Sequence, residues 1–165
     1  QHPALLAYLK SRKINAVVAQ GFCSEVHYTI KEKYGFSIGL KNNSEGWELR
    51  NTYFKASSSP KDLRLITNGS QNLIVIEGMF DLLSLVTLFP NIKREADFLI
   101  LNSIAFAEKA LPYLDTYTTV ELYLDQDKAG RKKNSFFLNT SAKCIDKSCF
   151  YKAEKDLNAW LMKTH

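Results

Sequence analysis

The chain has 165 residues, of which 45% are hydrophobic and 24% are charged. This composition is typical of a globular domain, and it excludes a disordered tail, a collagen-like fibre and a mucin-like stalk. The 22 Lys and Arg residues exceed the 17 Asp and Glu residues, and the resulting formal charge of +5 allows an anionic partner such as nucleic acid.

Residues 1–70 are expected to form a small α+β subdomain. Its first helix is predicted from Pro3 to Arg12, because Pro stands near its start and Leu recurs on one face. The runs that follow are rich in β-branched and aromatic residues and are joined by turn residues, a pattern typical of antiparallel hairpins. The polar stretch 55–62 is expected to be a loop. The other elements predicted here are a helix at 15–20 and strands at 25–31, 34–40, 47–51 and 63–66.

Residues 71–165 are expected to form an α/β domain, because predicted strands and helices alternate four times. The strands are apolar throughout rather than alternately apolar and polar, which is typical of a parallel sheet covered on both faces. We therefore predict a four-stranded, mostly parallel sheet flanked by helices. The strands are expected at 72–78, 97–103, 119–125 and 143–151, and the helices at 79–89, 105–114, 128–140 and 155–163.

The three cysteines, Cys23, Cys144 and Cys149, are too few to favour a disulfide framework, and their number is odd. No apolar run approaches the roughly 20 residues of a membrane span. The first residues also lack the charged and apolar regions of a signal peptide. These features predict a cytoplasmic protein without a membrane partner. Because the chain does not begin with Met, we interpret it as an excised fragment.

Five acidic residues follow strands or precede helices of the predicted domain. Glu77 and Asp125 each end a predicted strand, Asp81 lies one helical turn after Glu77, Asp127 lies two residues after Asp125, and Asp156 precedes the last helix. Ligands of open α/β sheets bind beyond the carboxyl ends of the strands, so we expect these acids to meet at one edge. The alternative for Asp127 is that it only caps the helix that follows.

A cluster of carboxylates normally requires a cation, because the like charges repel one another and raise one another's pKa. Oxygen ligands suit a hard ion such as Mg2+ or Mn2+. Such sites act on phosphates, where a metal ion orients the nucleophile and neutralises developing charge. The acids therefore predict a metal-dependent reaction on a phosphate.

Two motifs carry a resemblance to a known family. A strand that ends Glu-Gly-x-x-Asp (Glu77, Gly78, Asp81), followed by a strand that ends Asp-x-Asp-x-x-Gly (Asp125, Asp127, Gly130), resembles the TOPRIM domain. That domain occurs in bacterial-type primases, several topoisomerases, OLD-family nucleases and recombination-mediator proteins. The stretches IEGMFDLLSL and KDLNAWL look most like the primase version, and the second resembles primases from mobile elements of Bacteroides-like bacteria.

The resemblance implies a DNA-directed nucleotidyltransferase that synthesises RNA primers from NTPs on a single-stranded DNA template, with a replicative helicase as a partner. It implies that Glu77 is a general acid/base or a metal ligand, and that Asp125 and Asp127 are catalytic and bind Mg2+. Asp81 would be an accessory metal ligand, and Asp156 would occupy the late acidic position of primases. One departure is that Asn158 follows Asp156 where replicative primases usually carry further acids.

Basic residues are candidates for binding template or nucleotide phosphates. Arg50, Lys55 and Lys61 surround the serine-rich loop, Arg131 follows Gly130, and Lys155 stands beside Asp156. The alternative for Lys55 and Lys61 is a solvated linker. The neighbours of Arg131, Lys132 and Lys133, are expected to form a solvated helix face.

Zinc is not expected in this fragment. Primases carry a zinc-binding module before this core, but Cys23 and His27 have no second pair of ligands, and Cys144 and Cys149 have the wrong spacing. Two other functions remain open from the sequence. One is another TOPRIM enzyme, such as a nuclease or a topoisomerase-like fragment, and the other is a non-catalytic nucleic-acid-binding module.

Overall fold

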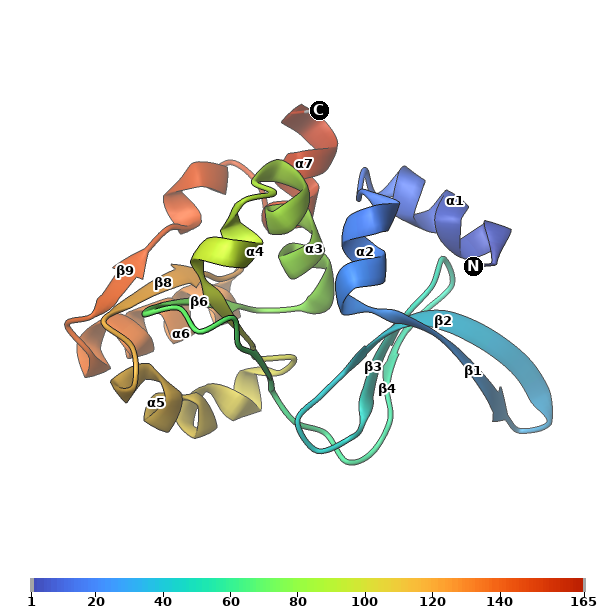
Figure 1. The fold of residues 1–165 in the computed structure, drawn as a ribbon, viewed down its shortest axis with the longest axis horizontal. Helices are drawn as coiled ribbons and strands as arrows, with labels where there is room; N and C mark the ends of the chain where they lie inside the picture. The colour runs from blue at the N-terminus through green and yellow to red at the C-terminus, as the bar shows by residue number, and fades with distance from the viewer. Residues whose placement is uncertain (1, 165) are drawn as a thin grey trace.

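The structure is a computed structural model that describes residues 2–164 and contains two sheets lying side by side (Figure 1). The first sheet has the strand order β1-β2-β3-β4, and all of its neighbouring strands are antiparallel. Two helices precede it, as the sequence predicts. The elements of this part are α1 (Pro3–Ser11), α2 (Ala16–Phe22), β1 (Ser24–Ile30), β2 (Lys33–Lys41), β3 (Trp47–Arg50) and β4 (Lys55–Ser57).

The strand β4 lies in a stretch that the sequence analysis places in a loop. Its residues are short and polar, but its backbone pairs with β3, with Ala56 opposite Leu49. Backbone pairing needs no apolar side chain, so the composition of this edge strand hides it. The rest of the predicted antiparallel hairpins are confirmed.

The second sheet has the order β5-β7-β6-β8-β9, with β7, β6, β8 and β9 parallel. The predicted mostly parallel sheet is confirmed, but it has five strands instead of four, because β5 pairs antiparallel with β7. The strand β5 lies before residue 70 but belongs to the second sheet. The boundary between the two parts of the chain at residue 70 therefore remains a prediction. The elements are β5 (Arg64–Ile66), β6 (Asn72–Ile76), α3 (Met79–Leu88), α4 (Ile92–Glu95), β7 (Asp97–Ile100), η1 (Ile104–Phe106), α5 (Ala107–Asp115), β8 (Thr119–Tyr123), α6 (Lys128–Thr140), β9 (Cys144–Asp146), η2 (Ser148–Tyr151) and α7 (Leu157–Thr164).

Helices cover both faces of the second sheet. Alternate residues of β6 separate the two cores: Ile74 and Ile76 pack toward α3 and α7, while Leu73 and Val75 pack toward α5 and α6. This explains the uniformly apolar strands, because each face of the sheet is buried. No helix within residues 2–164 is long and apolar enough to cross a membrane.

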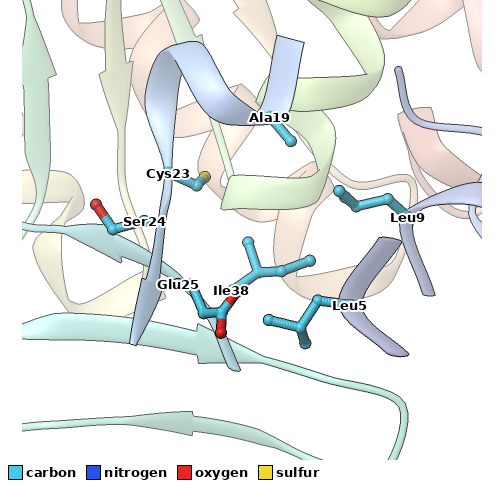
Figure 2. A pocket seen from close by; sticks show the side chains of 7 residues that line it. All are labelled: Leu5, Leu9, Ala19, Cys23, Ser24, Glu25 and Ile38. Carbon is cyan, nitrogen blue, oxygen red and sulfur yellow. The ribbon is translucent and has the colours of Figure 1, made fainter. Parts of the chain in front are cut away.

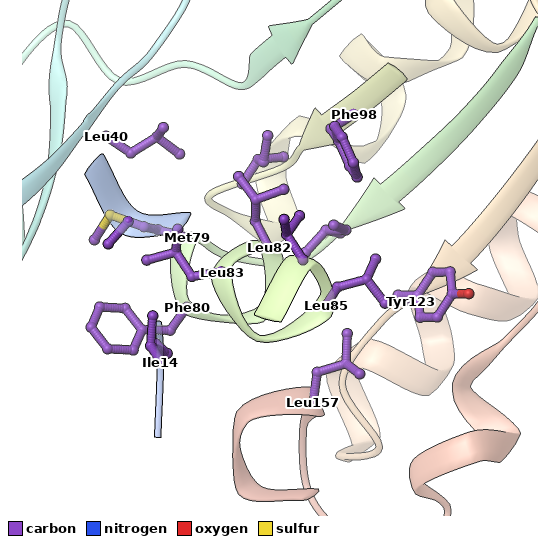
Figure 3. Packing of buried hydrophobic residues seen from close by; sticks show 14 of the residues in the cluster. Ile14, Leu40, Met79, Phe80, Leu82, Leu83, Leu85, Phe98, Tyr123 and Leu157 are labelled. Carbon is purple, nitrogen blue, oxygen red and sulfur yellow. The ribbon is translucent and has the colours of Figure 1, made fainter. Parts of the chain in front are cut away.

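The helix α3 joins the two parts of the chain into one core. Figure 3 shows Ile14 and Leu40 of the N-terminal part against Met79 and Phe80 at the start of α3, and the same cluster continues to the second sheet. Seven of the ten residues of α3 are buried: Met79, Phe80, Leu82, Leu83, Ser84, Leu85 and Val86. A helix that is apolar on all sides must be enclosed, and here both parts of the chain enclose it.

A small cavity of about 20 Å³ lies between α1, α2 and the first sheet (Figure 2). Cys23 lines it together with Leu5, Leu9 and Ile38. Burial raises the pKa of the Cys23 thiol to about 12, so the thiol is protonated at neutral pH. Cys23 therefore acts as a small apolar residue of the N-terminal core.

The first turn of α6 packs directly on the end of the strand that precedes it. A Cβ atom at Gly130 would lie 2.0 Å from the backbone oxygen of Asp125, which is less than any real contact. Glycine is therefore required at this position of the Asp-x-Asp-x-x-Gly motif by packing. By contrast, a Cβ atom at Gly21, on the exposed side of α2, would meet nothing within 4 Å.

We expect Gly130→Ala to destabilise the protein by about 1–3 kcal/mol, because the new methyl group forces α6 away from the end of β8. The matched change Gly21→Ala should be neutral or stabilising by up to about 1 kcal/mol, since Ala favours the helix and nothing obstructs it. Urea unfolding followed by circular dichroism measures both. Equal stability of Gly130→Ala and the wild-type protein would show that the close packing is wrong.

Candidate active site

The acidic residues gather where the order of strands reverses. The chain leaves β6 to form β7 on one side of it, and later returns to form β8 on the other side. The carboxyl ends of β6 and β8 are therefore neighbours, and Glu77 and Asp125 follow them. A long hydrogen bond of 3.4 Å, donated by the backbone N–H of Asp125 to Oε2 of Glu77, connects the two ends. This is the position where open α/β sheets bind ligands.

Asp81 lies one turn into α3 and faces the same carboxylates. Burial raises its pKa well above the ordinary value, and the charges of Asp125, Asp156 and Glu77 raise it further. A hydrogen bond from the backbone of Asn158 acts in the opposite direction. Because these acids affect the pKa of Asp81, the side chains that follow β6 and β8, begin α3 and precede α7 lie close together.

Asp125 is affected by the same neighbours. Burial raises its pKa to about 7, and Glu77, Asp156 and Asp127 contribute in the same direction. Lys155 opposes this effect. The structure therefore brings together the five acids selected from the sequence, and their like charges repel one another.

Asp127 and Asp156 are both bound to the first turns of helices. Oδ1 of Asp127 accepts hydrogen bonds from the backbone N–H groups of Ala129 and Gly130 at 3.0 and 2.9 Å, and these bonds lower its pKa. Oδ1 of Asp156 accepts a bond of 2.7 Å from the N–H of Ala159. The capping role considered for Asp127 is thus present. These hydrogen bonds use Oδ1 of Asp127 and Oδ1 of Asp156, and Oδ2 of each residue remains for a ligand.

Lys133 is part of this site, and the expectation that it lies on a solvated helix face is wrong. Its side chain is 4% exposed, and Nζ lies 2.8 Å from Oε1 of Glu77, which is itself 20% exposed. The ammonium group has no hydrogen-bond partner elsewhere among residues 2–164, so Glu77 is its counter-ion. The sequence did hold a signal for this burial, because Gly130, Lys133 and Phe137 recur at helical spacing on the buried face of α6.

Two arginines approach the acids from the N-terminal part. The guanidinium groups of Arg12 and Arg50 each lie 5.8 Å from the ring centre of Phe80, the residue next to Asp81. Burial lowers the pKa of Arg50, while Asp81 is among the groups that act in the opposite direction. Nε of Arg12 is buried without a partner among the described residues. The sequence analysis selected Arg50 and missed Arg12, because Arg12 reaches the site only through the packing of α1 on α3.

Lys55 and Lys61 are exposed and lie near Arg50. Burial raises the pKa of Glu48 on β3, and Lys55, Lys61 and Arg50 all act in the opposite direction. The three basic side chains therefore surround one half-buried carboxylate. The structure groups them beside the serine-rich loop, as the sequence analysis expects.

The other two selected cations, Arg131 and Lys155, lie beside the segment that follows β8. Arg131 is exposed, and its Nε donates a hydrogen bond of 2.8 Å to the backbone oxygen of Gln126. Lys155 is exposed, and its backbone oxygen accepts a bond of 2.7 Å from the N–H of Gln126. Both residues therefore contact the short segment that holds Asp125 and Asp127.

Asn158, the departure from the expected acidic pattern, is buried and has a structural role. Its amide donates to the backbone oxygen of Arg12 at 3.0 Å and to Oγ of Ser84 at 2.9 Å. It thereby connects α7 to the end of α1 and to α3. A carboxylate at this position would have no N–H group to donate to these two oxygens.

The carboxylates suit a hard cation through their oxygen atoms. However, within residues 2–164 no group of three or more His, Cys, Asp or Glu side chains has its ligand atoms arranged around a common point. Binding of a metal ion therefore requires rotation of these side chains. The positive charge of Lys133 balances Glu77. The raised pKa values of Asp81 and Asp125 show that their ionised forms are unfavourable in this environment, and a bound cation would favour ionisation.

Comparisons with known proteins agree with this geometry. Residues 74–161 match a family described as Toprim-like, and residues 1–59 match a domain of unknown function, DUF8464. No curated protein matches the sequence significantly.

Three solved structures share the fold. The primase fragment of the bacteriophage T7 primase-helicase protein has 20% identity and a TM-score of 0.65, covering 91% of this chain and 66% of that fragment. The primase domains of gp4 in a complex with the T7 lagging-strand DNA polymerase have 19% identity and a TM-score of 0.62, covering 84% and 76%. A DNA primase domain from Pseudomonas aeruginosa has 13% identity and a TM-score of 0.55, covering 99% and 70%.

The chain therefore spans just under two thirds of the length of the T7 primase fragment. At these identities the likeness establishes a common fold over nearly all of this chain, including the N-terminal sheet.

We expect Glu77→Gln to destabilise the protein by about 3 kcal/mol, because it leaves the buried ammonium of Lys133 without its counter-ion. The double variant Glu77→Gln/Lys133→Met should recover most of this loss, since both charges are then absent. Lys132→Met, at the exposed neighbouring position, should change stability by less than about 0.5 kcal/mol. Urea unfolding measures all three, and additive effects of the two substitutions would contradict the ion pair.

Proposed function

The chain belongs to the Toprim-like family, and we propose that it is a DNA primase core, which joins ribonucleotides on a single-stranded DNA template with the help of Mg2+ or Mn2+. The observation that carries this proposal is the meeting of two oppositely charged sets of residues. The acids lie at the ends of β6 and β8, and Arg12 and Arg50 of the N-terminal part lie over Phe80, the residue next to Asp81.

The acidic set suits a metal-dependent reaction on a phosphate. In this proposal Asp125 and Asp127 are the metal ligands, with Asp81 and Asp156 as accessory ligands that reach the same edge. A bound Mg2+ would neutralise charge that develops on the phosphate during transfer. The unused oxygen atoms of Asp127 and Asp156 are the groups that remain available to it.

Glu77 is held in place on both of its carboxylate oxygens. Lys133 contacts Oε1 and the N–H of Asp125 reaches Oε2, so the side chain has a defined orientation at the end of β6. We assign Glu77 the role of general acid/base or metal ligand, and Lys133 the role of a positioning residue. A carboxylate fixed in this way keeps its geometry without a bound substrate.

In this proposal the basic residues bind the phosphates of the template and the nucleotide. Arg12 and Arg50 are placed to contact a phosphate beside Asp81, and a guanidinium binds phosphate with two parallel hydrogen bonds. Lys55 and Lys61 are exposed and suit template phosphates farther along the strand. Arg131 and Lys155 lie where a nucleotide phosphate would meet Asp125 and Asp127.

A partner follows from the same proposal. One similar structure is a fragment of a primase-helicase protein, so we infer that this chain acts together with a replicative helicase. Another similar structure has primase domains bound to an RNA/DNA hybrid. This supports an RNA primer on a DNA template as the product of the reaction.

We expect Mn2+ to bind the wild-type protein more tightly than the variant Asp125→Asn/Asp127→Asn, because the amides keep the shape of the side chains but remove their charge. Electron paramagnetic resonance of free Mn2+ during a titration measures the affinity directly. Asp115→Asn, at an exposed position at the end of α5, is the control and should bind like the wild type. Equal affinity in the double variant would remove these residues from metal binding.

We expect Glu77→Gln/Lys133→Met to incorporate labelled NTPs on single-stranded DNA at least about 100-fold more slowly than the wild-type protein, because the double variant has lost the catalytic carboxylate. Lys133→Met alone should keep part of the wild-type rate, because Glu77 remains. Using the double variant separates the chemical role of Glu77 from the stability that its ion pair provides. Near-equal rates would exclude Glu77 from the reaction, and a wild-type protein without metal-dependent incorporation would contradict the proposed primase activity.

A further inference from the structure

An open groove of about 510 Å³ lies on the first sheet. It is bounded by the beginning of α1, the tip of the β1–β2 hairpin and the loop between β3 and β4. In Figure 1 these three segments lie at the end of the molecule that is remote from the second sheet. None of the acids of the acidic edge lines the groove, so the groove is a separate surface.

Five of the thirteen residues that line this groove are aromatic: Tyr28, Tyr34, Phe36, Tyr53 and Phe54. The side chain of Tyr53 is 92% exposed, and that of Tyr34 is 68% exposed. One face of Phe36 is stacked on His2, with 3.8 Å between the ring centres. The two tyrosines thus present large ring surfaces to solvent, which is unusual for aromatic residues and marks a surface that binds a partner.

The loop that carries Tyr53 is held in a defined shape. Oδ1 of Asn51 accepts hydrogen bonds from the N–H groups of Tyr53 and Phe54, at 2.8 and 3.1 Å. Nδ2 of Asn51 donates to the backbone oxygen of Phe36 at 3.1 Å. Asn51 thus anchors the loop to β2 while the Tyr53 ring remains outside, so little order must be gained when a ligand binds.

The floor of the groove is also adapted to a flat ring. A Cβ atom at Gly35 would lie 2.5 Å from the ring of Tyr28, so glycine is needed for this ring to lie against the β2 backbone. The hydroxyl group of Tyr28 is 2.9 Å from Oγ of Ser37, and its ring meets Phe54 edge to face at 5.9 Å. Tyr28 therefore forms a fixed part of the groove beside Phe54 and the loop that carries Tyr53, whereas Tyr34, next to Gly35 in β2, extends from the other face of the sheet.

Cations border the aromatic surface. Lys31 and Lys33 at the tip of the β1–β2 hairpin line the groove and are exposed. Aromatic rings on which bases stack, together with cations that contact phosphates, are the two components of surfaces that bind single-stranded nucleic acid. This combination favours a nucleic acid over an apolar protein segment, which would not need the lysines.

The groove continues from the basic residues beside the acidic edge. The loop 51–54 directly joins Arg50 and Lys55, which pair with each other across β3 and β4. Tyr53 is three residues after Arg50 and two before Lys55 in the chain. A DNA strand whose phosphates contact Arg50 and Lys55 therefore passes close to Tyr53. Basic side chains that can contact phosphates are present both beside the acidic edge and along the groove.

We propose that this groove binds bases of single-stranded DNA by stacking on Tyr53 and Tyr34, and that it extends the template path beyond the acidic edge. This role of the groove rests on the proposed primase function, because it requires the template to pass Arg50 and Lys55. Lys31 and Lys33 hold phosphates of the same segment. Because every base has a flat face that can stack on a ring, the groove accepts any sequence.

The first test uses the complete chain and a fluorescein-labelled oligothymidylate, with affinity measured by fluorescence anisotropy. Tyr53→Ala and Tyr34→Ala should each weaken binding by about tenfold, since stacking of one base is lost. Tyr53→Phe should bind like the wild type, because the ring remains. Phe150→Ala is the matched control, as Phe150 is an aromatic residue of η2 that is 57% exposed and lies outside the groove.

The dependence on salt separates stacking from charge. Tyr53→Ala should lower the affinity equally at all salt concentrations, whereas Lys31→Ala/Lys33→Ala should reduce the slope of log affinity against log salt by about 1.4, from two phosphates at about 0.7 each. An oligonucleotide with iodouracil, which forms photochemical crosslinks to aromatic side chains, should attach to Tyr53 or Tyr34. Mass spectrometry of the digested protein identifies the attached residue.

The outcomes distinguish the groove from the proposed function. If Lys55→Ala/Lys61→Ala weakens binding but the tyrosine variants do not, the groove proposal is overturned and the proposed template path at Arg50 and Lys55 stands. If neither set weakens binding, both fail. Equal losses in Phe150→Ala and Tyr53→Ala, or crosslinks only outside the groove, also overturn the groove. Losses confined to the groove variants, with crosslinks at the tyrosines, support it.

Discussion

The enclosure of α3 is the constraint on which the rest of the structure depends. This helix follows Glu77 directly and carries Asp81, and its apolar surface is too extensive for one sheet face to cover. The second sheet and α7 bury one side of it, and the N-terminal part buries the other. The apolar contact of Met79 and Phe80 with Ile14 and Leu40 therefore decides where the arginines of the N-terminal part stand relative to the acids.

The acidic edge is a region of unbalanced charge held between rigid elements. The helix caps fix Asp127 and Asp156, the packing of Gly130 on Asp125 fixes the beginning of α6, and Lys133 balances Glu77 from within the core. The mutual repulsion of the remaining carboxylates is the physical cost of this arrangement. Bringing such groups together destabilises a fold unless a cation is bound, and it is a common feature of sites that act on phosphates.

The acidic edge and the aromatic groove have complementary chemistry. The acidic edge suits a metal ion and the reacting phosphates, while the aromatic groove suits unpaired bases. The β3–β4 hairpin lies between them, with Arg50 and Lys55 at its strand ends and Tyr53 in its loop. A single short hairpin therefore connects the basic residues beside the acidic edge to the aromatic groove, and these are the two kinds of side chain that bind single-stranded nucleic acid in other proteins.

The sequence by itself determined most of the elements and the position of the acids, because both depend on local patterns. Apolar strands and helical periodicity indicated the parallel sheet, and Glu77, Asp81, Asp125 and Asp127 stood at positions that any such sheet brings to one edge. The tertiary structure alone decided which cations meet these acids. Lys133 was expected to be solvated and is buried against Glu77, and Arg12 lies over the ring of Phe80, next to Asp81, only because α1 packs on α3. It also decided that β5 joins the second sheet and that Asn158 is an internal connection. Each of these depends on which segments distant in the sequence come into contact, and local patterns of residues do not contain that information.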